Sequence, residues 1–400
     1  MTPLPIPPFI IGEIYDYGVF VLCLFLAGAY MGSNSCDKLM VRQSPLMATV
    51  LIVIIIVLLG LRPVSIAFGD TVNYAASYRR MVPNFGTIDW SKEWLFGLFT
   101  TWCKSMGFTV YAWFLFLAIG YFGIMYYAYK KALFENAWFA ILFGLSAFST
   151  LTYGVNGLRN GLACSIVTLA IIFAAKDKNY IITGVLCFLA LGIHKSTLLP
   201  MAAMVAALFV IKKPHIALTF WLISIPLSLA AGGPISSFFM GLGFDDRAEQ
   251  YMSAQGIEGG TSIGKTGFRW DFLLYSAMPV WLIWHVQKTI ERKRLQMGVE
   301  KTMEEEESGV YGAGILADTE SMRVYNVLAV IYLLANAFWV MVIKANFSNR
   351  FAYLSWFLYP LVIAYPVIRL HIWEDQDKKA GLILLAHASF TIVMHILGKV

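Results

Sequence analysis

The chain is short of charged residues and of cysteine, and both shortages exclude classes of protein. Only 14% of its 400 residues are charged, whereas 59% are hydrophobic. An average soluble domain is about one-quarter charged. The five cysteines are scattered and form no C-x-x-C pair, so we expect neither a disulfide framework nor a zinc site. The sequence also contains no P-loop, no internal repeat and no soluble domain, which argues against an attached ATPase.

The apolar residues occur in blocks about as long as a bilayer is thick, which predicts an all-α polytopic membrane protein. We expect a single integral membrane domain over residues 1–400 with about 12 transmembrane helices. The first residues lack the basic region of a cleavable signal. The expected spans are 18–33, 45–61, 108–128, 137–151, 158–175, 180–193, 197–211, 216–232, 271–287, 323–343, 351–369 and 381–397.

The distribution of lysine and arginine predicts the orientation of these spans. Basic loops at 130–131, 176–178 and 212–213 fall on one side, and the positive-inside rule makes that side cytoplasmic. The charged loop 288–322 joins them, and we expect it to be solvated and partly disordered. Segments 62–107, 233–270 and 344–351 then face outward, and both termini do so as well. Within the first of these, residues 94–106 are typical of an interfacial helix with tryptophans at its rim.

Arg159 stands in the first turn of an apolar run, 157–166, which reads "GLRNGLACSI". An arginine facing lipid costs about 2.5–3.5 kcal/mol at a helix centre and less near an interface. Asn156 and Asn160 share its side of the helix, and the helix N-terminus favours anions. We therefore consider an anion-binding patch at this position. The alternative is an arginine that snorkels to the interface.

Other arginines occupy comparable positions at the predicted outer face. Arg350 precedes a long apolar run and Tyr353 follows one turn later. Arg247 and Tyr251 lie one turn apart in the large outer loop, and Arg269 stands just before the ninth span. The alternative for these loop arginines is an ordinary ion pair with an aspartate, at Asp245, Asp246 or Asp271.

Asp70 and His194 are the candidate proton acceptors. Asp70, Tyr74 and Tyr78 have i, i+4, i+8 spacing, so a helix would place a carboxylate and two phenols on one face. Asp70 could equally be only the N-cap of that helix. His194 stands at the outer turn of "LGIHKSTLLP", where a histidine often serves only as a cap or an interfacial hydrogen-bonding group.

Together these side chains suit an enzyme that handles a lipid diphosphate sugar. Arginine is suited to bidentate phosphate binding, and tyrosine can stack on sugar rings. Guanidinium groups would stabilise a diphosphate leaving group as its charge develops. A carboxylate or a histidine would deprotonate the acceptor hydroxyl.

The order of the motifs resembles the EpsG-type branch of Wzy polysaccharide polymerases, which make O-antigen, capsule or exopolysaccharide. The motifs are "GD…NY…SY", "NGLRNGLA", "LGIHKSTLLP", "DRAEQY" and "NRFAYL", within residues 60–370. Relatives often have Arg-Gln where this chain has Arg159 and Asn160. The resemblance implies a GT-C-like multi-spanning glycosyltransferase fold with its site built from outer-face loops. It also implies a bacterial inner membrane location and no cofactor, metal or nucleotide sugar.

The resemblance further implies the reaction and the partners. Undecaprenyl-diphosphate-linked oligosaccharide repeat units would be joined at the periplasmic face by transfer from one lipid diphosphate to another. The expected partners are this lipid, the bilayer, and a flippase and chain-length regulator of the same pathway, with no nucleic acid. The resemblance does not settle which residue is the base. From the residues themselves we expect Asp70 or His194 to take the acceptor proton. We expect the diphosphate to bind Arg159, Arg247, Arg269 and Arg350, and the sugar groove to contain Tyr74, Tyr78, Asn156, Asn160, Tyr251 and Tyr353.

Two other functions are compatible with such a chain. A flippase or other transporter of lipid-linked oligosaccharide would need polar groups through the membrane midplane, whereas here the span centres are mostly aliphatic. A membrane O-acyltransferase of surface glycans is suggested by a histidine in a span, but no site for an acyl donor is visible. The sequence leaves the sugars, the linkage and the stereochemistry open.

Overall fold

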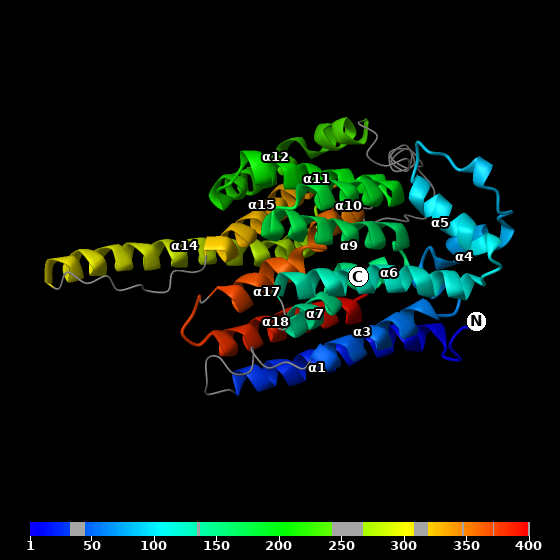
Figure 1. The fold of residues 1–400 in the computed structure, drawn as a ribbon, viewed down its shortest axis with the longest axis horizontal. Coiled ribbons are helices and arrows are strands. Elements are labelled where there is room, and N and C mark those ends of the chain that lie inside the picture. Colours follow the sequence, from blue (N-terminus) through cyan, green and yellow to red (C-terminus); the bar gives the residue numbers. More distant parts are fainter. Residues whose placement is uncertain are drawn as a thin grey trace.

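The fold is an all-helical bundle (Figure 1). The computed structural model describes residues 1–32, 45–133, 137–241, 267–307, 319–345, 348–370 and 372–398, and every regular element within them is a helix. Seven of these helices are long and apolar enough to cross a membrane, and a bent pair makes up to eight. The all-α polytopic fold predicted from the sequence is thus confirmed. The count of about 12 is not, because three further apolar helices are shorter than a usual span.

The centre of the bundle differs from its periphery in how much of each helix is buried. The apolar stretch that begins with α9 (Leu158–Ile172) and runs to Asp177 is 78% buried, and so is the apolar stretch of α15 (Thr319–Met341). The window formed by α16 (Ser348–Trp356) and α17 (Tyr359–Arg369) is 94% buried. By contrast, only 22% of the window of α1 (Pro8–Met31) is buried. An apolar helix that is exposed all along one side is suited to contact lipid.

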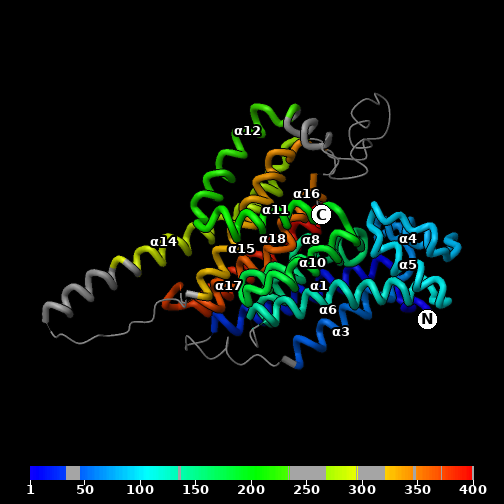
Figure 2. The backbone as a smooth tube through the Cα atoms, turned by 45° about the horizontal axis from the view of Figure 1, so that its top comes forward, coloured from blue at the N-terminus to red at the C-terminus, as the bar shows by residue number. Residues whose placement is uncertain are grey.

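Neighbouring helices pack along the central ones. The α9 helix lies against α6 (Val110–Leu133) and α10 (Tyr180–Ile193), and α15 lies against α12 (Pro214–Gly241), as Figure 2 shows for α12 and α15. The remaining helices near them are α3 (Pro45–Gly60), α11 (Leu198–Val205) and two single π-helical turns, η4 (Phe173–Asp177) and η6 (Ala206–Val210).

The α1 helix packs on α18 (Gln376–Ile396) at the periphery. Their backbones approach closely at Gly381, where an added Cβ would lie 2.7 Å from the carbonyl oxygen of Ala27. Since the start of α18 meets the end of α1, the two helices are antiparallel. The end of α18 therefore reaches the start of α1.

The segment expected as one span at 137–151 is broken. The α7 helix (Ala137–Leu145) and α8 (Phe148–Val155) meet at an angle of 71°. At the break, Ser146 Oγ donates to the Phe143 carbonyl and lies 3.1 Å from His387 Nδ1. Because of this bend, the end of α8 and the start of α9 lie at one end of the bundle, where the candidate site is. We call this the site end.

Short elements of the segment 62–107 cover the site end. They are η1 (Ile66–Phe68), α4 (Thr71–Arg80), η2 (Phe85–Thr87) and α5 (Trp94–Ser105), and Figure 1 shows α4 and α5 beside the N-terminus. The α5 helix packs on α10 and matches the interfacial helix expected at 94–106 in extent.

Arg62 is fully buried beneath these elements and hydrogen-bonds to three segments of the chain. Its guanidinium donates to the Leu59 carbonyl at 2.5 Å, the Val155 carbonyl at 3.0 Å and Thr71 Oγ1 at 3.1 Å. The ring of Phe114 lies 4.6 Å from the guanidinium carbon. Burial lowers the pKa of Arg62 to about 9, so it stays protonated at neutral pH. Arg62 therefore ties α4 to the ends of α3 and α8.

Two expected loops are partly helical. The α14 helix (Trp270–Glu307) continues from its apolar half into the segment expected as the charged loop 288–322. The α12 helix, with a kink at Ala231, likewise extends into the expected outer loop 233–270. Residues 242–266 and 308–318 lie outside the described residues.

Candidate functional site

A cavity of about 110 Å³ at the site end brings together side chains from distant parts of the sequence. It lies among α4, the start of α9, the turn between α10 and α11, and the start of α16. Eight of the residues selected from the sequence line it: Asp70, Tyr74, Asn156, Arg159, Asn160, His194, Arg350 and Tyr353. Leu199, Phe338, Phe351 and Leu354 form an apolar wall. We call this the first cavity.

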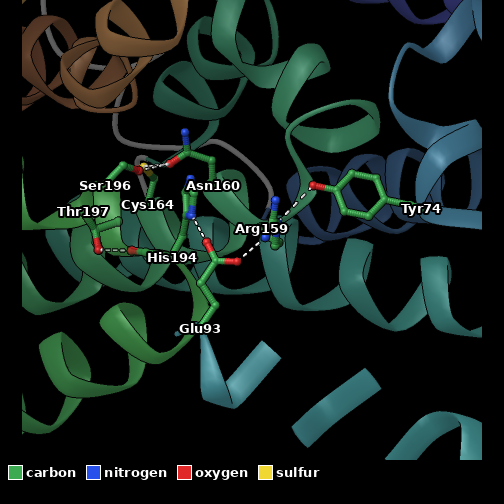
Figure 3. A network of polar contacts seen from close by, with 8 residues as sticks. All are labelled: Tyr74, Glu93, Arg159, Asn160, Cys164, His194, Ser196 and Thr197. Atoms are coloured by element: carbon green, nitrogen blue, oxygen red, sulfur yellow. Dashed lines mark hydrogen bonds and ion pairs between the residues drawn. The ribbon is translucent and has the colours of Figure 1, made fainter. Parts of the chain in front are cut away.

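Glu93 connects two of these residues, and sequence reasoning missed it. One carboxylate oxygen of Glu93 pairs with Arg159 Nη1, and the other accepts a hydrogen bond from His194 Nδ1 (Figure 3). The side chain of Glu93 is 17% exposed, so both contacts are shielded from water. A guanidinium that is paired with a shielded carboxylate does not extend into the lipid headgroups. This disfavours the alternative in which Arg159 snorkels to the membrane interface.

The backbone at Glu93 directs its side chain toward these partners. Glu93 precedes α5 with φ 40° and ψ 39°, the left-handed conformation that a residue other than glycine seldom adopts. Such strain costs about 1–3 kcal/mol and persists where the surroundings compensate for it. A weak signal exists in the sequence, since Glu93 is an acid directly before the predicted helix 94–106.

Glu93 stays ionised at neutral pH. Burial is the largest single influence and raises its pKa, but the hydrogen bond from His194 and the charges of His194 and Arg159 together outweigh burial. The net result is a pKa below the usual value for glutamate. An ionised carboxylate accepts from His194 Nδ1–H whether the ring is charged or neutral, and in the neutral ring Nε2 then carries the lone pair.

Arg159 has a second partner on α4. Its Nε lies 3.3 Å from Tyr74 Oη, and the ring centroid of Tyr74 is 5.9 Å from the guanidinium carbon. Figure 3 shows Arg159 between Tyr74 and Glu93. The guanidinium is thus held in place from two sides while it lines the first cavity, a preorganised geometry for binding an anion.

Asp70 is more than a helix cap. It occupies the N-cap position of α4, yet its side chain makes no capping hydrogen bond. Instead Oδ1 accepts from Asn73 Nδ2 at 3.1 Å, and Oδ2 lies 3.8 Å from Arg350 Nη2. Asp70 and Arg350 therefore face each other across the cavity, with about a third of each side chain exposed.

The two asparagines beside Arg159 position neighbouring segments. Asn156 Oδ1 accepts from the backbone N–H of Asp70 at 2.8 Å. Gly69, with φ 58°, makes room for it, because a Cβ there would lie 2.7 Å from the Asn156 side chain. Asn160 Oδ1 accepts from Ser196 Oγ at 3.1 Å, which joins α9 to the short helix η5 (Lys195–Thr197) after His194.

An aromatic cavity of about 390 Å³ adjoins the first one and shares Asp70, Tyr74 and Arg159 with it. Its floor is Tyr78, whose ring stacks on Trp113 with centroids 4.8 Å apart. The Tyr78 hydroxyl donates to the Phe108 carbonyl at 2.9 Å, and Lys104 Nζ lies 5.1 Å from the centroid of its ring, so Tyr78 is held in place on several sides. The expected shared face of Asp70, Tyr74 and Tyr78 is present.

Tyr353 is buried in the wall of the first cavity, where its ring meets Tyr153 edge to face with centroids 5.4 Å apart.

Arg269 departs from the expected diphosphate set. It does not line the first cavity, and its guanidinium makes a two-point contact with Asp271 at 2.9 and 2.8 Å. The Phe272 ring lies 3.6 Å from the guanidinium carbon. The ion-pair alternative therefore describes Arg269, because the first turn of α14, which begins at the next residue, supplies the carboxylate of Asp271. The expected Arg247 and Tyr251 lie outside the described residues, as do Asp245 and Asp246.

The arrangement places Arg159, Arg350 and His194 around one cavity, with His194 Nδ1 against the Glu93 carboxylate. In the part of the chain that the structure describes, no group of three or more His, Cys, Asp or Glu side chains could hold a metal ion. The chemistry available to these residues is proton transfer at His194 and charge stabilisation by Arg159 and Arg350.

Comparison with known proteins gives one match. The profile of the EpsG family matches residues 46–398, which is most of the chain. The chain belongs to the EpsG family. The family suggests a polysaccharide polymerase-like function for this membrane protein, and the match covers Asp70, Glu93, Arg159, His194 and Arg350. No curated protein matches this EpsG-family chain. No solved structure matches it either, so the GT-C-like architecture remains an expectation.

Proposed function

We propose that the protein polymerises lipid-diphosphate-linked oligosaccharide repeat units at the outer face of the bacterial inner membrane. The growing chain on one undecaprenyl diphosphate would be the donor, and the terminal hydroxyl of another lipid-linked repeat would be the acceptor. The observation that supports this most directly is that Arg159 and Arg350, from α9 and α16, line one cavity with His194. The family match supports the reaction class.

The arginines would bind the donor diphosphate. When the anomeric carbon–oxygen bond breaks, its electron pair leaves with the diphosphate oxygen. The guanidinium groups of Arg159 and Arg350 stabilise that developing charge, and they do so more strongly in a site with little water than in bulk solvent. The apolar wall of the first cavity gives the first part of the prenyl chain a surface to leave along.

His194 would be the base. Its Nε2 accepts the proton of the acceptor hydroxyl as the acceptor oxygen bonds to the anomeric carbon. Glu93 keeps Nδ1 protonated and stabilises the imidazolium that results, as a carboxylate does in other acid–base dyads. Between the two candidates, this geometry favours His194, because Asp70 already faces Arg350 and Asn73.

The test is incubation of the purified protein with a lipid-linked repeat unit and no nucleotide sugar. Wild-type protein should give a ladder of longer products. Arg159→Ala should abolish lengthening of the glycan while the protein still inserts into the membrane. Arg159→Lys should be strongly impaired, because an ammonium group cannot make the planar two-point contact that a guanidinium makes with a phosphate.

Arg80→Ala is the matched control, since Arg80 is exposed on α4 and, among the described residues, hydrogen-bonds only to the Ala76 carbonyl of its own helix. Near-normal product from Arg159→Ala would contradict the proposal. Movement of unaltered substrate across a vesicle membrane by the wild type would instead indicate a transporter.

A further inference from the structure

A second cavity, of about 370 Å³, adjoins the first cavity at the site end. The two share Thr152 and Asn156 as lining residues, so a substrate segment leaving the first cavity past Asn156 would enter the second. It lies among the start of α1, the end of α18 and the α7–α8 break. None of the residues so far assigned to diphosphate binding or proton transfer lines it.

The electrostatic character of the second cavity is opposite to that of the first. Its charged groups are Glu13 and Asp16 on α1, with His395 on α18 between them. His395 Nδ1 lies 3.3 Å from Asp16 Oδ2, and His395 Nε2 lies 3.8 Å from Glu13 Oε1. No lysine or arginine occurs among the described residues that line it. A diphosphate would meet two carboxylates here, and their charge would repel it.

The carboxylates have unused capacity to accept hydrogen bonds. A carboxylate offers about four lone-pair sites, and the contact with His395 occupies at most one of them on each acid. Asp16 Oδ2 is shielded from solvent, and its one contact with a polar group of the described residues is the His395 ring nitrogen at 3.3 Å, without hydrogen-bond geometry. A shielded carboxylate oxygen that is satisfied by one such contact still has lone pairs to offer, so a ligand that brings hydroxyl donors would be favoured here.

The remaining walls suit the other face of a sugar. Phe9, which is exposed, presents an aromatic ring against which the C–H face of a pyranose can pack, and Thr391 adds a hydroxyl. Carboxylates that accept from hydroxyls, combined with an aromatic face, recognise a polyhydroxylated ligand without charge. The two cavities thus separate the two chemical halves of a lipid-linked repeat unit, namely its anionic diphosphate and its neutral sugars.

We propose that the second cavity binds the uncharged glycan of a lipid-linked repeat unit whose reacting end lies in the first cavity. This inference rests on the proposed function for the identity of the ligand, but glycan binding can be measured separately from polymerisation.

The experiment uses the full chain in nanodiscs and two probes. One is a neutral repeat-unit oligosaccharide released from the host's own polymer, without lipid or phosphate, whose binding is followed by saturation-transfer NMR. The other is farnesyl diphosphate, whose binding reports the first cavity. Asp16→Asn keeps the shape of the side chain and removes its charge. It should weaken oligosaccharide binding about tenfold or more, the loss of one hydrogen bond to a charged group, and leave farnesyl diphosphate binding unchanged.

A second variant fills the cavity without touching the acids. Gly12 lines it, and a side chain added there meets nothing within 4 Å, so Gly12→Leu should fold normally and exclude the sugar. Gly18→Leu is the matched control, because Gly18 lies on the same helix with equally open surroundings and does not line the cavity. It should bind the oligosaccharide as the wild type does.

The outcomes separate this inference from the proposed function. Oligosaccharide binding that is lost in Asp16→Asn and Gly12→Leu and kept in Gly18→Leu supports the second cavity, even if the wild type does not polymerise. Polymerisation by a wild type whose oligosaccharide binding is absent, or is unchanged in both variants, would overturn the inference and leave the proposed function standing.

Discussion

Replacement of Glu93 by glutamine tests whether one carboxylate organises both halves of the site. The substitution keeps the size of the side chain but removes its charge and one of its two acceptor oxygens. Arg159 Nη1–H and His194 Nδ1–H both point at that group (Figure 3). The amide oxygen of glutamine satisfies one of these donors, and its NH₂ group must then face the other.

The expected loss of stability follows from the hydrogen bond to a charged group that each of these two donors loses. A hydrogen bond to a charged group contributes about 1.5–3 kcal/mol, and the 17% exposure of Glu93 reduces this only in part. We expect a loss of about 2 kcal/mol in the free energy of unfolding. His194 can relieve the clash by moving its proton to Nε2, which removes the lone pair needed for catalysis. General bases contribute about 10²–10⁴-fold to a rate. The polymerisation rate should therefore fall by about that factor, which corresponds to a rise of about 3–5 kcal/mol in the activation free energy.

The assay is the rate of product-ladder formation by purified protein, together with farnesyl diphosphate binding and thermal unfolding. Glu93→Asp retains a carboxylate that is one methylene shorter and should recover part of the activity. Asp89→Asn is the control, since Asp89 is an exposed acid of the same segment whose side chain, in the described part of the chain, accepts hydrogen bonds only from Ser91. A folded Glu93→Gln protein that polymerises within about threefold of the wild type would refute the role of the Glu93–His194 pair.

Three further outcomes are expected. Arg62→Met should lower the free energy of unfolding by about 2–4 kcal/mol, because three carbonyl or hydroxyl acceptors lose their buried donor. Denaturant unfolding measures this change. A change below about 0.5 kcal/mol would contradict the role of Arg62 in holding α4 to the ends of α3 and α8. Gly69→Ala should destabilise by about 1–2 kcal/mol or more, since its φ of 58° is strained for alanine and the new Cβ meets Asn156; an equally stable variant would show that the η1–α4 turn tolerates a side chain. The pKa of Glu93 is lowered in the folded protein, so the stability that its ionised form contributes is present above the unfolded-state pKa of about 4.3 and is lost as the pH falls through the folded-state pKa. The difference in the free energy of unfolding between wild type and Glu93→Gln should therefore close below about pH 4.3. A difference that persists unchanged in acid would contradict the ion-pair account.

The sequence by itself determined the class of fold and a large part of the candidate site. Span-length apolar blocks require helices, because the backbone polar groups of a chain in lipid must be satisfied within each segment. The same cost makes a polar residue in an apolar run conspicuous. Arg159, His194 and Arg350 were selected on that ground, and the structure places all three at one cavity.

Tertiary structure alone decided how those residues are paired. Glu93 has no conspicuous local context, and its role depends on a loop that folds back so that one carboxylate meets residues 66 and 101 positions away. The bend between α7 and α8, which brings Asn156 beside Asp70, is likewise absent from the hydropathy pattern. Arg269 resembled the other arginines in sequence, yet it folds onto Asp271 and does not reach the cavity. Membrane insertion and helix formation depend on residues close together along the chain. Electrostatic partnership depends on distances in space, and these are set only when the helices pack.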